Sequence, residues 1–279
     1  MHETVSSDRV LNDLDKALRR IDLDSLDVVT FSGIGEPTLN PNLEDIASSV
    51  KERIGRLPMV ILTNASMFHR NDVRRALTEF DMVVAKLDAG DDETFHSINR
   101  PINPGLSIGS VIDSIKKLGE ETEGRIALEV MLLDSEGEQP SNIQDSRLQS
   151  LLKAIFEINP EIVQLLVPYR PPSESFVRVP SPERMKLISD ELSEVLGEER
   201  LWVYGTHDRR GKSVRRLSLE SLEEDVVELL RRRPCRDIDI ASSLMMNLSD
   251  ARQLLRELEE RNLVVSERRG GENYYSYRK

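Results

Sequence analysis

Short apolar runs alternate with amphipathic helical patterns along residues 7–205, and this alternation constrains the fold of the chain more than any other feature. The helical patterns space their apolar residues three and four apart. Because parallel strands are joined by crossovers that are usually helices, this order predicts an α/β fold with a parallel sheet. Right-handed crossovers then place successive strands side by side. The predicted strands are residues 28–31, 59–63, 82–87, 126–133, 162–167 and 201–204.

Composition narrows the class of protein further. The chain has 279 residues, 38% of them hydrophobic, which is enough for one large domain and one small domain. A single cysteine excludes a disulfide within the chain, and the four histidines show no metal-ligand spacing, so no metal site is predicted. No run approaches the roughly 20 apolar residues of a membrane span, and we expect a cytoplasmic protein. A net charge of −12 argues against general binding of phosphate backbones.

The end of the first predicted strand has the residues of a ligand site. Residues 28–31 run directly into Gly33, Gly35, Glu36 and Pro37. In parallel α/β folds ligands bind at the carboxyl ends of the strands. The two glycines let a backbone approach a ligand closely, and Glu36 offers a carboxylate to an ammonium group. The alternative is an ordinary turn into a helix, with Glu36 near the helix N-terminus and no ligand.

Two charged residues interrupt neighbouring apolar strands. Lys86 and Asp88 point to one face because strand side chains alternate, and Glu129 breaks the apolar run 126–133. A charge in a central strand is costly unless it is paired. We therefore predict that Lys86 and Glu129 face an interior cavity and interact there. In the alternative, one of them lies at an open sheet edge or under a loop.

The pattern changes after a basic stretch at residues 209–216. It becomes helix, helix, helix and hairpin, which resembles a winged helix, with Ser249 as the expected cap of the third helix. The predicted domains are 1–208 and 217–279, joined by the basic linker. Acidic and basic residues nearly balance in the second domain, which favours docking of a protein over contact with nucleic acid. The arginines that offer a local nucleic-acid contact are Arg252, Arg256, Arg268 and Arg269.

A helix is expected at residues 7–20, where five apolar residues form one stripe. In a βα-repeat protein such a helix usually follows a strand. Two interpretations stay open: a first strand is missing, or the helix docks on the sheet edge.

Three ordered motifs resemble the radical S-adenosylmethionine (SAM) superfamily, particularly the branch that includes wyosine-synthesis enzymes acting on transfer RNA and their prokaryotic relatives. The resemblance covers about residues 7–170. The motifs are Ser-Gly-x-Gly-Glu-Pro-Thr-Leu at 32–39, Ile-Leu-Thr-Asn-Ala-Ser at 61–66, and Lys-Leu-Asp-Ala at 86–89 continuing to residues 94–101.

The resemblance implies a partial TIM-type (β/α) barrel that lacks its first strand. It also implies residue roles at three strand ends. Gly33, Gly35 and Glu36 would hold the amino group of SAM. Thr63, Asn64 and Ser66 would lie near the cofactor or substrate, and Asp88 would be placed for a ribose hydroxyl. For Asn64 the alternative is a turn residue whose side chain closes a loop.

The family also uses a [4Fe-4S] cluster held by a Cys-x3-Cys-x2-Cys loop, and this chain has only Cys235. Either the sequence is truncated before its cluster loop, or the protein has lost its cluster; the intact SAM-side motifs favour truncation. The expected function of an intact form is reductive cleavage of SAM and action on an unknown substrate, with RNA as a candidate. The alternative is an inactive SAM- or small-molecule-binding regulator coupled to the winged helix, so enzymatic activity is left open.

Overall fold

The computed structural model describes residues 5–33, 35–122, 125–168, 172–203, 222–244, 246–269 and 271–278. It divides into two compact units. The first comprises Met1–Leu11 and Val28–Arg210, and the second comprises Asn12–Asp27 and Gly211–Lys279. The sequence prediction assigned Asn12–Asp27 to the first domain, and the predicted linker 209–216 lies outside the described residues. The predicted domain boundaries stay a prediction.

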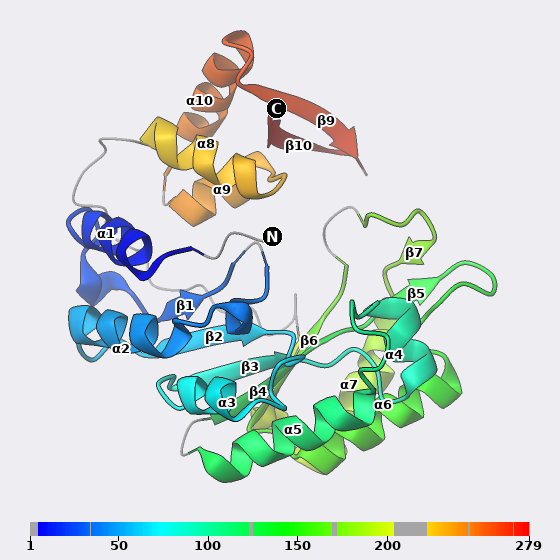
Figure 1. Ribbon diagram of the computed structural model, residues 1–279. Helices are drawn as coiled ribbons and strands as arrows, with labels where there is room; N and C mark the ends of the chain where they lie inside the picture. Colours follow the sequence, from blue (N-terminus) through cyan, green and yellow to red (C-terminus); the bar gives the residue numbers. More distant parts are fainter. Residues whose placement is uncertain are drawn as a thin grey trace. The chain divides into compact units, whose positions relative to one another are not determined.

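The first unit is built on a six-stranded parallel sheet (Figure 1). Its strands follow one another in chain order, as expected from right-handed crossovers between neighbours. The α/β class and the parallel sheet predicted from the apolar runs are confirmed. The strands are β1 (Val29–Phe31), β2 (Met59–Thr63), β3 (Met82–Lys86), β4 (Arg125–Met131), β6 (Ile162–Leu166) and β8 (Leu201–Val203).

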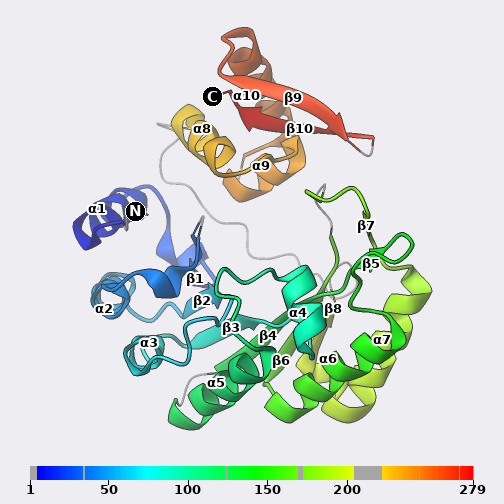
Figure 2. The same cartoon turned by 45° about the vertical axis from the view of Figure 1, so that its right-hand side comes forward.

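Helices cover one face of this sheet (Figure 2). Strand residues that face the helices are fully buried, as Val163 and Leu165 in β6 are, while their neighbours on the other face are mostly half-buried. The helices bury the apolar stripes predicted from three and four spacing, for example Val111, Ile115 and Leu118. These helices are α2 (Leu43–Ile54), α3 (Asn71–Leu77), α5 (Ile108–Glu121), α6 (Asp145–Ile158) and α7 (Pro182–Leu196).

Side chains at the strand-to-helix connections start several helices. Asp91 caps α4 (Asp92–Ile98) and Ser107 caps α5, each accepting a hydrogen bond from a backbone N–H three residues on. Ser181 caps α7 in the same way, and Pro182 follows it at the start of the helix, where its fixed φ suits the helical backbone. These caps set where each helix begins above its strand.

The first 200 residues also contain smaller elements, not all of which belong to the first unit. Among the described residues β1 lies at one edge of the sheet and β8 at the other. The pair β5 (Asp134–Ser135) and β7 (Val177–Arg178) is antiparallel and follows the ends of β4 and β6. Helix α1 (Ser7–Leu18) has no fully buried side chain, so its apolar stripe lies outside the closed core. The short helices are η2 (Pro37–Leu39) and η3 (Glu198–Arg200) in the first unit and η1 (Leu23–Ser25) in the second.

Three helices and a hairpin form the C-terminal part of the second unit. They are α8 (Leu222–Arg232), α9 (Asp237–Leu244), α10 (Leu248–Glu260), β9 (Val264–Arg269) and β10 (Glu272–Tyr277), with the two strands antiparallel. Buried residues from every helix and from β9 make one core, which includes Cys235. The expected cap at Ser249 is wrong, because Asn247 holds that position and Ser249 lies inside α10. Within the described residues, no helix has the length and apolar character needed to span a bilayer.

Candidate functional site

The carboxylate of Glu36 connects the ends of β1 and β2. Its Oε1 accepts hydrogen bonds from the backbone N–H of Thr38 (3.1 Å) and from the hydroxyls of Thr38 and Thr63 (both 2.6 Å). Its Oε2 accepts from the backbone N–H of Asn64 at 2.7 Å. Glu36 also caps η2, so the helix-turn interpretation describes part of its role. The carboxylate is held rigidly, and Oε2 keeps a lone pair that no described residue uses.

The two glycines before Glu36 differ in their surroundings. A Cβ added to Gly33 would lie 3.3 Å from the Gly35 carbonyl oxygen, whereas one added to Gly35 would meet no atom within 4 Å. Gly35 is also not among the residues with a positive φ. Neither packing nor backbone conformation within the described residues therefore requires glycine at position 35. The open space beside Gly35 leaves room for a ligand to approach the backbone closely.

A cavity of about 450 Å³ opens at these strand ends. Its floor is the face of the sheet opposite the helices, and its rim contains the glycine and glutamate motif. The lining residues are Ser32, Gly33, Gly35, Glu36, Pro37, Leu62, Thr63, Asn64, Val84, Lys86 and Glu129. Of the predicted site residues in this unit, Ser66 and Asp88 do not line it.

A tight turn follows β2. The side-chain oxygen of Asn64 accepts from the Ser66 N–H at 2.9 Å, and Thr63 Oγ1 accepts from the Ala65 N–H at 3.1 Å. Ala65 has φ of 57°, in the left-handed region. The side chain of Asn64 thus closes a loop, as the alternative interpretation expected, while its backbone N–H binds Glu36 and the residue still lines the cavity.

The charged residues of β3 and β4 form a compact network. Lys86 Nζ lies 3.1 Å from Glu129 Oε1 and 3.3 Å from Asp88 Oδ1, and all three side chains are at least half-buried. Burial by itself lowers the pKa of Lys86, but the negative charges of Asp88 and Glu129 outweigh it, so the pKa is raised above its usual value. The structure brings together the two residues that sequence reasoning placed in one cavity.

Asp88 has a structural role, connecting the end of β3 to β4 and the end of α4 through hydrogen bonds. It is 4% exposed, its Oδ1 accepts from the Met131 N–H at 2.9 Å, and its Oδ2 accepts from Asn99 Nδ2 at 2.9 Å. Asn142, fully buried, donates to the carbonyls of Asp88 and Met131. A ribose contact for Asp88 stays a prediction without support from this geometry. Sequence reasoning missed Asn99 and Asn142, and no local pattern marks Asn142, because its partners are distant in the sequence.

Metal ligands do not gather in the described residues: no three His, Cys, Asp or Glu side chains are placed to hold an ion. Cys235, the only cysteine of the chain, is 2% exposed in the core of the second unit. A cluster that needs three thiolates does not fit these residues.

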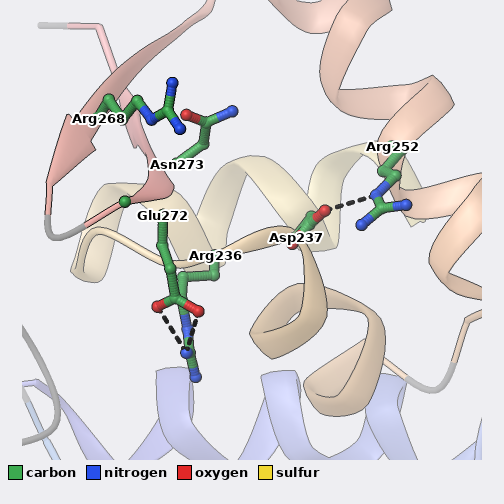
Figure 3. Close-up of a pocket in the computed structure, with 7 residues that line it drawn as sticks. Arg236, Asp237, Arg252, Arg268, Glu272 and Asn273 are labelled. Atoms are coloured by element: carbon green, nitrogen blue, oxygen red, sulfur yellow. Dashed lines mark hydrogen bonds and ion pairs between the residues drawn. The ribbon is translucent and has the colours of Figure 1, made fainter.

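A polar cavity of about 370 Å³ lies in the second unit (Figure 3). Arg236 binds Glu272 and Asp239, and Arg252 binds Asp237 at 2.6 Å. The hydrogen bonds of Arg236 to these carboxylates raise its pKa far above the usual value. The residues that line this polar cavity are Arg236, Asp237, Arg252, Arg268, Gly271, Glu272 and Asn273.

The four predicted nucleic-acid contacts are thus divided. Arg252 and Arg268 line this cavity, Arg256 is exposed on α10 and does not, and the side chain of Arg269 lies outside the described residues.

Comparison with known proteins identifies a superfamily domain in the N-terminal half of the chain. The profile of the Radical SAM superfamily matches residues 4–140. The chain carries a radical SAM domain. A UPF0026 protein of Methanocaldococcus jannaschii is 26% identical over 235 residues, covering 84% of this chain and 70% of that protein. A UPF0026 protein of Synechocystis sp. is 35% identical over 146 residues, covering 52% of each.

A solved structure agrees with this chain in fold. Streptococcus suis SuiB, solved bound to S-adenosylmethionine, superposes with a TM-score of 0.52 at 13% identity, over 74% of this chain and 45% of that protein. At that identity the likeness shows the fold alone. The chain thus spans about half of SuiB and about half of the Synechocystis relative.

Proposed function

We propose that the strand ends of β1 and β2 bind SAM, with Glu36 accepting a hydrogen bond from the methionyl ammonium group. The observation that carries this proposal is a lone pair on Glu36 Oε2, at the rim of the cavity, that no described residue uses. The radical SAM domain supports the choice of ligand. The open space beside Gly35 supports a close backbone approach.

Charge and size in the cavity suit this ligand. Glu36, Glu129 and the adjoining Asp88 carry three carboxylates against the single ammonium of Lys86. The excess negative charge favours a ligand that carries a sulfonium and an ammonium group. The volume of about 450 Å³ is within the usual range for small-molecule sites.

Reductive cleavage of SAM requires an iron-sulfur cluster in addition to a SAM-binding site. When bound, a [4Fe-4S] cluster supplies the electron for that reaction, and it needs three cysteine thiolates. The chain has one cysteine, Cys235, and it is buried in the second unit. We therefore propose SAM binding for the residues present, inside an open, partial (β/α) barrel. A regulator that binds SAM without cleaving it is the alternative function, and it is supported by the same cavity.

Calorimetric titration of the chain with SAM tests the proposal. Gly35→Ala is expected to fold normally, because its Cβ meets no neighbour, and to weaken SAM binding about tenfold or more by blocking the approach of the ligand. Glu36→Gln is expected to weaken binding by a similar factor through loss of a charged acceptor. Gly105→Ala, in an exposed loop, is the matched control. Unchanged SAM affinity in both site variants would contradict the proposal.

For the second unit we propose a winged-helix arrangement, supported by three helices followed by an antiparallel hairpin. Among the described residues Arg256 and Arg268 have no acidic partner, whereas Arg236 and Arg252 are neutralised by carboxylates. This separation makes Arg256 and Arg268 the candidate contacts for RNA, with protein docking as the competing role.

RNA binding measured at several salt concentrations distinguishes these roles. If Arg256 and Arg268 contact phosphates, changing both to Glu lowers affinity and reduces the salt dependence. Arg278→Glu is the control. Equal RNA affinity in all three proteins would favour docking of a protein.

A further inference from the structure

Four side chains form a row across the sheet. Lys86 on β3 is in register with Glu129 on β4, Glu129 with Gln164 on β6, and Gln164 with Trp202 on β8. Residues in register on parallel strands point to the same face of the sheet. The row therefore runs from the proposed SAM side of the sheet to its far edge.

Burial shows which face the row occupies. Val163, Leu165, Leu201 and Val203 flank Gln164 and Trp202 along their strands and are all buried on the helix-covered face. Gln164 and Trp202 are half-buried and lie between them in the alternation. Lys86 and Glu129, at the other end of the row, line the cavity. The whole row therefore faces away from the helices.

Glu129 and Gln164 have hydrogen-bonding capacity that no described residue uses. Glu129 binds Lys86 through Oε1, and no described residue binds its Oε2. The side-chain amide of Gln164 makes no hydrogen bond to the described residues, although a half-buried amide normally has partners. A carboxylate oxygen and an amide oxygen, on residues in register, therefore face the same side of the sheet without donors among the described residues.

Charge and shape favour a cationic donor. Lys86 neutralises only one of its two carboxylate neighbours, Asp88 and Glu129, so the network keeps one negative charge. The indole of Trp202 adds an aromatic surface, which attracts planar cations. Acceptor oxygens, net negative charge and an aromatic ring together match a flat group that carries several N–H donors.

We propose that Glu129, Gln164 and Trp202 form a substrate subsite for a guanidinium or amidinium group. The inference extends the proposed function, because it assigns the substrate half of the face whose other half is proposed to hold SAM. Glu129 pairs with the cation, Gln164 accepts a further N–H, and Trp202 covers the flat face of the group. Lys86 holds Glu129 in place.

Tryptophan fluorescence tests this subsite directly, because Trp202 is the only tryptophan of the chain. The probes are agmatine, which carries a guanidinium group, and butylurea, a neutral molecule of similar shape. We expect a saturable fluorescence change with agmatine and none with butylurea at equal concentrations. A linear response to agmatine, or an equal response to both probes, would overturn the proposal.

Two variants assign the response to the row. Glu129→Gln is expected to weaken agmatine binding about tenfold, since it removes a charged acceptor. Gln164→Leu is expected to weaken it several-fold while the SAM affinity measured by calorimetry stays the same. Gln253→Leu, on α10, is the control. Unchanged agmatine affinity in Gln164→Leu would overturn the subsite. If the unmodified chain binds agmatine but does not bind SAM, the proposed function is overturned and the subsite is not.

Discussion

The backbone N–H of Asn64 donates a hydrogen bond to Glu36 Oε2 at 2.7 Å, joining the turns that follow two neighbouring strands. Beside it, the hydroxyl of Thr63 donates to the same carboxylate and accepts from the Ala65 N–H. The Thr63 hydroxyl therefore positions Glu36, the proposed SAM-binding carboxylate, and also stabilises the turn after β2.

Thr63→Val should destabilise the protein by about 1–3 kcal/mol, because the buried N–H of Ala65 loses its acceptor. Urea unfolding measures the change. Thr78→Val, at an exposed helix end, should shift the free energy of unfolding by less than about 0.5 kcal/mol. Equal effects of the two changes would contradict the role assigned to Thr63.

Lys86 and Glu129 should be energetically coupled. In a double-mutant cycle with Lys86→Met and Glu129→Met, we expect a coupling energy of about 1–2 kcal/mol in unfolding free energy. This is below the range for fully buried pairs, since the two side chains are 29% and 25% exposed and water screens them. Additive effects of the two changes would show that the pair contributes nothing.

The same lysine should make stability depend on alkaline pH. Because the pKa of Lys86 is raised in the folded protein, the charged form is favoured more in the folded than in the unfolded state. Its contribution is complete below the ordinary lysine pKa and is lost as the pH rises through the raised value. Urea midpoints from about pH 9 to pH 11.5 should fall more steeply in the unmodified chain than in Lys86→Met.

Gly90, in the loop after β3, lies against the backbone of helix α6. A Cβ at this position would lie 2.0 Å from the Ser150 carbonyl oxygen, which is backbone and cannot rotate away. Gly90→Ala should therefore cost about 1–3 kcal/mol or more of unfolding free energy. Gly109→Ala, inside α5 with its nearest neighbour at 4.0 Å, should instead be neutral or stabilising. Thermal unfolding of both variants checks the contrast.

Anaerobic reconstitution with iron and sulfide tests the fit of a cluster. With Cys235 as its only thiol, the chain should not acquire a stoichiometric [4Fe-4S] cluster. Visible absorption and iron content measure this outcome, and Cys235→Ser should give the same result. A stoichiometric cluster in the unmodified chain would show that other residues supply the missing ligands.

Local patterns in the sequence were sufficient for the order and class of the elements. Apolar runs located all six parallel strands, and three and four spacing located the buried faces of α2 and α5. The alternation of side chains also placed Lys86 and Glu129 on one face. These predictions succeed because they depend on periodicity within one element.

The roles of Glu36 and Asn64 required the turns to be seen in three dimensions. Each of them has two functions, since Glu36 both caps η2 and binds the turn of β2, and Asn64 both closes a loop and donates to Glu36. Sequence reasoning treated such pairs of roles as alternatives. They coexist because a carboxylate has two oxygens, and an asparagine has a backbone N–H as well as a side chain.

The chain's own residues therefore determined a parallel α/β sheet and a glycine and glutamate motif at one strand end. Only the tertiary structure decided that Asn142 supports Asp88, and that Gln164 and Trp202 continue the row begun by Lys86 and Glu129. The physical reason is register. Periodicity assigns side chains to faces within a strand, but the alignment between strands distant in the sequence is set by the packing of the whole sheet.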